Sequence, residues 1–233
     1  MPTSAYTQRR SEVATYFDKT AVEAWRKLTS DAPVSKIRAT VRAGRDRMRN
    51  TLLGYLPDDL SGRRILDAGC GTGAFAIEAA SRGADVMAID LSPKLVELAQ
   101  ERLPKDIGSG RIDWASGDML DDRHGAFDHV VAMDSMIHYR TPDLIEMLGR
   151  LSARTSTSII FTHAPRTPLL MAMHTVGQIF PRGNRSPSIV PVASKTVHKT
   201  VTDHDKFEGW NIGRHSQINS GFYLSCAQEL VKV

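Results

Sequence analysis

The chain has 233 residues, of which 41% are hydrophobic and 24% are charged, a size that allows one buried core with an appended element. Its two cysteines, Cys70 and Cys226, argue against a disulfide framework and favour a reducing, cytoplasmic setting. The sequence begins without the apolar segment of a secretory signal. No apolar run in it approaches the roughly 20 residues of a membrane-spanning helix.

The net charge of +4 is concentrated at the start of the chain. Residues 1–56 hold 11 Lys and Arg against 5 Asp and Glu, whereas the remaining residues hold 19 against 21. A basic segment of this kind is either a solvated helix face or an attraction for an anionic substrate, partner or membrane surface. No aromatic-basic binding motif accompanies it, so nucleic acid is not an expected partner.

Helical spacing predicts two helices in the basic segment, over 7–30 and 34–56. They are separated by SDAPVS, where Pro33 breaks the helical pattern. The connector PDDLSG follows, so we expect residues 1–56 to form a helical arm distinct from a domain over 57–233.

From Arg63 onward the pattern alternates between strands and helices, which predicts a parallel sheet with both faces covered. The predicted strands are Arg63–Asp67, Asp85–Asp90, Arg111–Ser116, Phe127–Met133 and Ser158–His163. The predicted helices are Ala74–Arg82, Pro93–Leu103, Pro142–Ala153 and Pro168–Phe180. Two further alternating segments, Lys206–Gln217 and Gly221–Val231, meet at Asn-Ser-Gly and predict a closing antiparallel hairpin.

A glycine-rich loop follows the first strand and opens the next helix. It reads Asp67-Ala-Gly69-Cys-Gly71-Thr-Gly73, and such glycines let backbone N–H groups approach a ligand closely. The same residues fit a dinucleotide fingerprint, so the loop alone suits NAD, FAD and S-adenosylmethionine equally well.

Three carboxylates near the loop separate these cofactors. Asp67 would repel a pyrophosphate and attract the ammonium and sulfonium groups of S-adenosylmethionine. Asp90 ends the second strand, where it can accept hydrogen bonds from ribose hydroxyls in either cofactor. Asp118 follows the third strand, where it can take an adenine amino group while Met119 packs on the ring. S-adenosylmethionine is therefore favoured over NAD.

This arrangement resembles the class I S-adenosylmethionine-dependent methyltransferases from Arg63 to Val233. The resemblance implies a Rossmann-like α/β fold with a mostly parallel seven-stranded sheet, a C-terminal antiparallel strand and an N-terminal helical lid. It implies S-adenosylmethionine as methyl donor, S-adenosylhomocysteine as product and no protein-bound metal. Met133-Asp134-Ser135-Met136 replaces the Asn-Pro-Pro-aromatic motif of base-methylating members. The cofactor-binding positions that the loop and the resemblance indicate are Asp67, Gly69, Gly71, Asp90, Leu91, Gly117, Asp118, Met119 and Met133.

Segments across the whole chain narrow the resemblance. VATYFDKTAVEAWRKL, VSKIRATVRAGRDRM, MDSMIHYR, FPRGNRSP and SGFYLS are together similar to the magnesium-protoporphyrin IX methyltransferase family of bacteriochlorophyll and chlorophyll biosynthesis. The family reaction esterifies a porphyrin propionate, and a carboxylate of normal pKa is already ionised at pH 7. Positioning and exclusion of water, rather than a strong base, are then the tasks of the protein.

The resemblance also implies roles for side chains outside the loop. His138 and Tyr16 lie near the reacting centre, with His138 either orienting the carboxylate or ligating the porphyrin magnesium, for which water is the rival ligand. Tyr16 belongs to a first helix that folds over the cofactor as a lid. The substrate-binding candidates are Lys36, Arg38, Arg42, Arg45, Ser135 and Tyr139.

Several expectations concern partners and alternatives. The apolar, Met-rich stretch Thr167–Gly183 is either a helix packed on the sheet, a wall for the macrocycle or a peripheral membrane contact. A magnesium chelatase subunit is the expected protein partner, and the photosynthetic membrane the expected surface. Two alternatives stay open: an O-methyltransferase acting on a phenol or quinone, with His138 as base, and a noncatalytic scaffold that passes porphyrin between enzymes.

Overall fold

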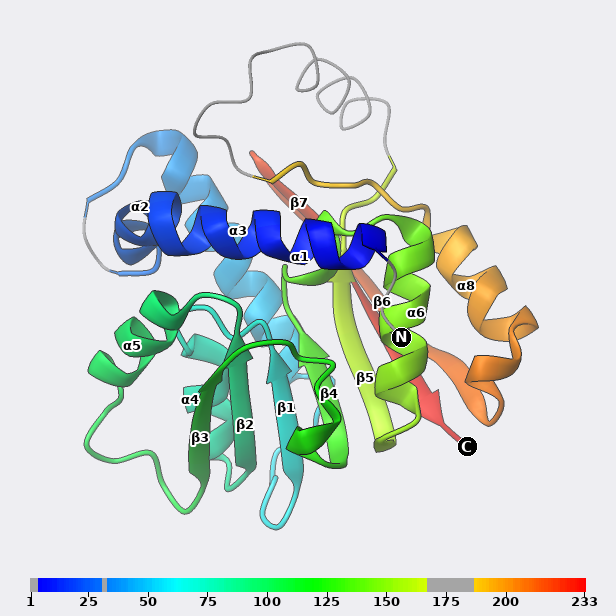
Figure 1. Ribbon diagram of the computed structural model, residues 1–233. Helices are drawn as coiled ribbons and strands as arrows, with labels where there is room; N and C mark the ends of the chain where they lie inside the picture. The colour runs from blue at the N-terminus through cyan, green and yellow to red at the C-terminus, as the bar shows by residue number, and fades with distance from the viewer. Residues whose placement is uncertain (1–3, 31–32, 167–186) are drawn as a thin grey trace.

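The computed structural model describes residues 4–30, 33–166 and 187–233, and these form one sheet flanked by helices (Figure 1). The sheet has seven strands in the order β3-β2-β1-β4-β5-β7-β6. Neighbouring strands from β3 to β5 run parallel, whereas β7 is antiparallel to both β5 and β6. The strands are β1 (Arg64–Ala68), β2 (Asp85–Asp90), β3 (Arg111–Ser116), β4 (Phe127–Ala132), β5 (Thr155–His163), β6 (Trp210–Ser220) and β7 (Tyr223–Lys232). The class I methyltransferase fold expected from the sequence is confirmed.

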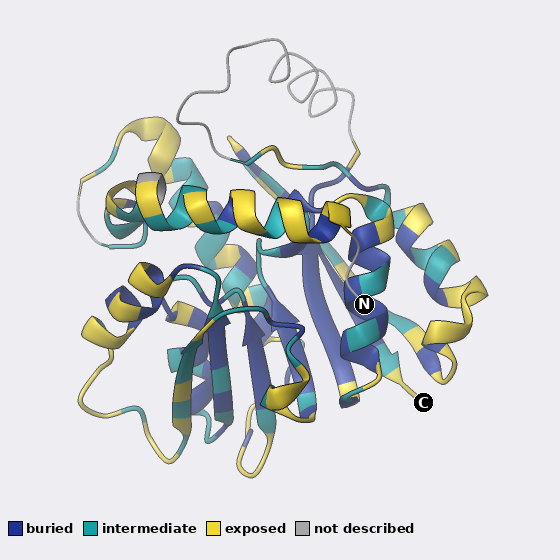
Figure 2. Ribbon diagram, in the orientation of Figure 1, coloured by how far each residue is buried: buried dark blue, intermediate teal, exposed yellow. Residues whose placement is uncertain are grey.

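Helices cover both faces of the sheet. Buried side chains of α3, α4 and α5 pack on one face, and those of α6 and α8 pack on the other. Figure 2 shows the result, with buried central strands and helices whose outer surfaces are exposed. The α-helices of the described chain are α1 (Ser4–Tyr16), α2 (Val22–Leu28), α3 (Lys36–Leu53), α4 (Ala74–Ser81), α5 (Pro93–Glu101), α6 (Thr141–Ser152) and α8 (Ser194–Asp203).

Local sequence explains where two of these helices begin. The Ser92 hydroxyl accepts a hydrogen bond from the backbone N–H of Leu95 at 3.3 Å, and Pro93 occupies the first turn of α5. Ser35 starts α3 in the same way, by accepting from the N–H of Arg38 at 3.4 Å. Both are side-chain caps that satisfy an otherwise free N–H at a helix start.

The N-terminal arm differs from the two helices that were expected. The predicted helix over 7–30 is divided by a π-helical turn at Phe17–Ala21, so that α1 and α2 are separate elements. In Figure 1, α1 lies across one end of the sheet, and α3 continues from the arm onto the sheet face. The arm therefore packs against the domain over 57–233 through several elements.

Two expectations about the C-terminal part need correction. Lys206–Gln217 was expected to be extended from its start, but β6 begins only at Trp210, after a short 3₁₀ turn at Asp205–Phe207. Helix α8 was not predicted, because its buried side chains are only Val197 and Val201, which are β-branched and weak helix formers. The helix expected over 168–180 lies outside the described residues. None of the described helices has the length and hydropathy needed to cross a membrane.

Candidate active site

A cavity of about 390 Å³ lies between the loops that follow the parallel strands and the N-terminal helices. The loops after β1, β2, β3 and β4 form its floor, and residues of α1, α2 and α3 close it from the opposite side. In open α/β sheets this carboxyl edge, where the strand order reverses between β1 and β4, is the usual position of a ligand site.

The start of the glycine loop, at Gly69, leaves no room for a side chain. Gly69 has φ +89°, and a Cβ atom there would lie 2.3 Å from Cβ of Ser135. The Ser135 hydroxyl in turn donates to the carbonyl of Ala68 at 2.6 Å. Ser135, an expected substrate contact, lines the cavity. It also holds the glycine loop in place through its contacts with Ala68 and Gly69.

Asp67 presents an unpaired carboxylate oxygen in this cavity. It is 1% exposed, and its Oδ2 atom has no hydrogen-bond partner among the residues that the structure describes. Burial, with a smaller contribution from the charge of Asp90, raises the pKa of Asp67 to about 8. A buried acceptor left unpaired is costly, and a cationic ligand group would supply its partner. The site therefore fits the ammonium group of S-adenosylmethionine.

Asp90 is held at the loop by two backbone hydrogen bonds. Its Oδ2 accepts from the N–H of Gly71 and its Oδ1 accepts from the N–H of Ser92, each at 2.9 Å. Burial nevertheless raises the pKa of Asp90. Each carboxylate oxygen has a second lone pair, so the side chain can still accept from ribose hydroxyls, as the sequence predicts.

Asp118 contacts helix α1, and its expected contact with adenine stays a prediction. Its Oδ1 accepts from the Tyr6 hydroxyl at 2.7 Å, and its Oδ2 is 2.5 Å from Nη1 of Arg10. Tyr6 and Arg10 are one turn apart on α1, so they share a face of that helix. Gly117 and Met119 do line the cavity. Asp118 thus fastens α1 over the site.

The remaining expected cofactor contacts, Leu91 and Met133, also line the cavity. Aromatic side chains of the arm lie opposite them. The Phe17 and Trp25 rings are 5.8 Å apart between centroids, and Trp25 Nε1 lies near Gly71.

Tyr16 is not among the cavity-lining residues of the described chain. Its ring instead contacts that of Phe17 edge-on, with centroids 5.2 Å apart. Of this pair, Phe17 lines the cavity in the part of the chain that the structure describes, and the expected role of Tyr16 stays a prediction.

The four basic candidates of α3 separate into two pairs. Lys36 and Arg38 are exposed at the start of the helix, away from the part of the described chain that lines the cavity. Arg42 and Arg45 do line it. Arg42, however, donates to the carbonyls of Lys27 and Leu28 at 2.8 and 2.9 Å, so it caps the last turn of α2.

Asp134 is the main residue of the site that sequence reasoning missed. It has φ +55°, a left-handed conformation that Asp tolerates better than most residues. Its carboxylate is 2.5 Å from Nη1 of Arg45 and accepts hydrogen bonds from the hydroxyls of Tyr223 and Thr162 at 3.1 and 3.2 Å. The residue stood in the Met133–Met136 segment, but its partners on α3, β5 and β7 are distant in sequence.

His138 lies at the cavity, as expected, and is 4% exposed. Burial lowers its pKa to about 4, so the imidazole is neutral at pH 7. Its Nδ1 is 3.5 Å from the carbonyl oxygen of Ser188, which can only accept. This assigns the hydrogen to Nδ1 and leaves a lone pair on Nε2.

Tyr139 follows His138 and also lines the cavity. Its ring stacks on that of Tyr6, with centroids 5.3 Å apart, and burial raises the pKa of its hydroxyl. The stacking links the loop after β4 to α1, and so joins the floor of the site to its cover.

Comparison with known proteins places the chain in a family. Residues 132–232 match the family described as magnesium-protoporphyrin IX methyltransferase C-terminus, and residues 65–156 match a methyltransferase domain family. The chain is 47% identical over 223 residues to the magnesium-protoporphyrin O-methyltransferase of Rhodobacter capsulatus, which covers 95% of this chain and 96% of that protein.

Two solved structures of magnesium protoporphyrin IX methyltransferase from Synechocystis PCC 6803 are also similar. The structure with bound SAH has a TM-score of 0.83 at 26% identity, covering 96% of this chain and 100% of that one. The structure with bound SAM has a TM-score of 0.76 at 25% identity, covering 99% and 100%. The similarity extends over nearly the whole chain, arm included, and the chain belongs to the magnesium-protoporphyrin O-methyltransferase family.

Proposed function

We propose that this protein transfers the methyl group of S-adenosylmethionine to a propionate carboxylate of magnesium-protoporphyrin IX, forming the monomethyl ester in bacteriochlorophyll or chlorophyll biosynthesis. The observation that carries the proposal is the unpaired Oδ2 atom of Asp67 in the cavity, within a chain of this family. An unpaired carboxylate oxygen attracts the positively charged groups of S-adenosylmethionine and repels the pyrophosphate of a dinucleotide cofactor.

The bound donor supplies an electrophilic methyl group, and the residues of the chain position the two reactants. Asp67 accepts hydrogen bonds from the ammonium group, Asp90 from ribose hydroxyls, and Met119 and Met133 provide apolar walls. Phe17 and Trp25 cover the cavity and exclude water. A carboxylate stripped of water is a stronger nucleophile, and no group has to remove a proton from it.

His138 is suited to act as a metal ligand or a hydrogen-bond acceptor. It is not suited to act as a general base that gains and loses a proton near pH 7. Its imidazole is neutral, and the Ser188 carbonyl fixes the hydrogen on Nδ1. A lone pair on Nε2 repels a carboxylate oxygen but can ligate the magnesium of the porphyrin substrate. Of the two roles expected for His138, this tautomer therefore favours the second.

The salt bridges of α3 constrain how the substrate is held. Arg45 forms a salt bridge with Asp134, and Arg42 donates hydrogen bonds to backbone carbonyls of α2. Arg49 also lines the cavity and is paired with Asp46 and Glu78. We infer that Arg45, with four N–H donors beyond the one directed at Asp134, contacts the propionate that does not react. Lys36 and Arg38 are then free to attract the anionic porphyrin from solution.

The experiment compares three acceptors under the same conditions. The protein is incubated with S-adenosylmethionine and magnesium-protoporphyrin, metal-free protoporphyrin or a catechol, and each product is identified by mass spectrometry. We expect one added methyl group on the magnesium porphyrin and none on the catechol, and no product from an Asp67→Ala variant. Methylation of the catechol alone would assign the protein to the phenol class, and no product from any acceptor would support the scaffold alternative.

Further partners follow from the resemblance alone. Delivery of the substrate by a magnesium chelatase subunit, and contact with the photosynthetic membrane from the cytoplasmic side, stay predictions. The stretch most suited to a membrane, 167–183, lies outside the described residues.

A further inference from the structure

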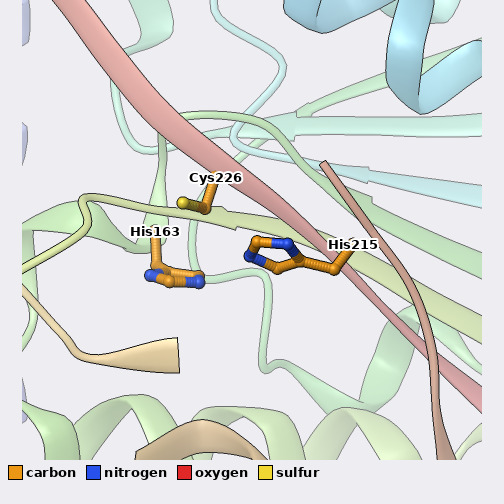
Figure 3. Close-up of side chains that lie close together, drawn as sticks. All are labelled: His163, His215 and Cys226. Atoms are coloured by element: carbon orange, nitrogen blue, oxygen red, sulfur yellow. The ribbon is translucent and has the colours of Figure 1, made fainter. Parts of the chain in front are cut away.

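Three potential metal ligands meet on the sheet, away from the cavity. His163 is the last residue of β5 and pairs in register with Cys226 of β7, and His215 lies on the adjoining strand β6. One ligand atom from each of these side chains lies within 4.8 Å of the other two. Figure 3 shows the three side chains grouped beside β7. None of them belongs to the lining of the cavity described above.

The imidazoles are oriented toward a common point. Nδ1 of His163 is 3.2 Å from the carbonyl oxygen of Val192, which assigns its hydrogen to Nδ1 and leaves Nε2 with a lone pair. Nε2 of His163 and Nε2 of His215 lie 3.5 and 3.4 Å from the same atom, Oγ of Ser194. An imidazole whose second nitrogen donates to a backbone carbonyl is the arrangement typical of histidine metal ligands.

We infer that His163, His215 and Cys226 form a binding site for a zinc-class divalent ion, with Ser194 or a water molecule at the fourth position. Two imidazole nitrogens and one sulfur suit Zn²⁺, whereas Mg²⁺ and Ca²⁺ prefer oxygen ligands. Tetrahedral bonds of about 2.0–2.3 Å place ligand atoms roughly 3.3–3.7 Å apart. The side chains therefore have to close by about 1 Å, and the exposed His215 has the freedom to do so.

Burial prepares two of the groups in opposite ways. It lowers the pKa of His163 to about 4, so this ligand is neutral at pH 7 as metal binding requires. It raises the pKa of the Cys226 thiol to about 11, so the ion has to displace a proton from sulfur. His198, whose ring is 6.3 Å from that of His215, is held by the side chain of Gln228 and is not required as a ligand.

The position of the site gives it a structural role. Val192 pairs with the end of β5 through Ala164, and Ser194 begins α8. The same segment, residues 187–194, carries the carbonyl of Ser188 that contacts His138. An ion bound by β5, β6 and β7 would fasten this segment to the sheet. No local sequence pattern predicts a protein-bound metal here, because the three ligands come from positions up to 63 residues apart.

Cobalt substitution tests the site without reference to activity. The full-length protein is treated with a chelator, titrated with Co²⁺ and followed by absorption, because a thiolate ligand gives a sulfur-to-cobalt charge-transfer band. We expect one Co²⁺ per chain with this band, displacement by Zn²⁺, and loss of the band in Cys226→Ser. Cys70→Ser is the matched control, since it removes the only other thiol.

One further variant and a second measurement keep the test decisive. His215→Gln changes an exposed side chain, so the fold should persist while Co²⁺ affinity falls by at least tenfold. Zn²⁺ should raise the melting temperature of the wild type and of Cys70→Ser, but not of Cys226→Ser. Absence of the charge-transfer band in the wild type, or its loss in Cys70→Ser with retention in Cys226→Ser, would overturn the assignment.

Discussion

Arg45 of α3 and Asp134 in the loop after β4 form a salt bridge with an N–O distance of 2.5 Å. Their side chains are 20% and 9% exposed, so the pair is largely shielded from solvent. The Arg45 guanidinium also lies over the Trp25 ring, 4.7 Å from its centroid. A single ion pair thus connects three parts of the site: the lid helix α2, the basic helix α3 and the loop after β4.

This pair should couple the stability of the arm to that of the sheet. In a double-mutant cycle with Arg45→Ala and Asp134→Asn, urea unfolding should give a coupling free energy of about 1–3 kcal/mol. The control is Arg49 with Glu78 on the same face of the sheet, whose side chains are 22% and 41% exposed. That more solvated pair should couple by less than about 1 kcal/mol. Equal coupling in the two cycles would contradict the special place given to Asp134.

The raised pKa of Asp67 predicts how donor binding depends on pH. Because its pKa of about 8 lies above the ordinary value for Asp, the free protein holds this carboxyl largely protonated at pH 6–7. Binding the ammonium group requires the ionised form, so the affinity for S-adenosylhomocysteine should rise about tenfold per pH unit from 6 toward 7.5. The rise should level off above about pH 8, where Asp67 is largely ionised even without the ligand.

Calorimetry at several pH values measures this dependence, and Asp67→Asn is its control. The variant should bind weakly at every pH and show no such rise. Wild-type affinity that is flat between pH 6 and 7.5, or an equal slope in the variant, would exclude Asp67 as the partner of the ammonium group.

The same residue should lower the stability of the ligand-free protein. A carboxyl whose folded pKa exceeds its unfolded pKa favours the folded state while it is protonated, and this contribution is lost as pH rises from about 4 toward 8. We expect Asp67→Asn to raise the free energy of unfolding at pH 8 by about 1–3 kcal/mol. Chemical denaturation of the ligand-free proteins checks this, and a less stable variant at pH 8 would contradict it.

Titration of His138 should not make kcat depend on pH in the neutral range. Its pKa of about 4 lies below that of a free imidazole, so its charge does not change between pH 5.5 and 8. With saturating substrates we expect kcat to be flat over this range, and His138→Ala to lower kcat by about 10–100-fold with the profile unchanged. A wild-type limb near pH 6.5 that disappears in the variant would make His138 a general base.

Substitutions at the neighbouring residues Phe17 and Tyr16 should have unequal effects on kcat. Phe17 lines the cavity and its ring is 6.0 Å from that of His138, whereas Tyr16 contacts the Phe17 ring and is not among the described residues that line the cavity. Phe17→Ala should therefore lower kcat by about tenfold or more, and Tyr16→Phe should lower it less, with S-adenosylhomocysteine affinity retained in both. Steady-state kinetics together with ligand binding separates these effects. A larger loss for Tyr16→Phe would show that its hydroxyl reaches the substrate.

The sequence predicted the sheet and the floor of the site well because both depend on local patterns. The loop from Asp67 to Gly73 and the acid at Asp90 follow strands that are visible as apolar runs, and parallel strands bring their carboxyl ends together. The network of Asp134 was not predictable in this way. Its partners come from α3, β5 and β7, and only the folded chain makes them neighbours.

The surroundings of Asp118 and Tyr16 show a second limit of sequence reasoning, while their expected roles stay predictions. Asp118 was assigned from its place after a strand and Tyr16 from the family resemblance, and neither specifies how α1 packs. The contacts of Tyr6 and Arg10 with Asp118 fix that packing, and the π-helical turn at Phe17–Ala21 decides which aromatic residue meets the cavity. Such choices depend on tertiary contacts between segments more than 100 residues apart.

The measurement that tests the central claim most directly follows a labelled methyl group. The protein is incubated with magnesium-protoporphyrin and S-adenosylmethionine carrying a trideuterated methyl group, and the porphyrin is analysed by mass spectrometry before and after mild alkaline hydrolysis. We predict one trideuteromethyl group per porphyrin, removed by hydrolysis as expected for an ester of a propionate. A label that resists hydrolysis, or a porphyrin that gains none, would contradict methyl transfer to a carboxylate.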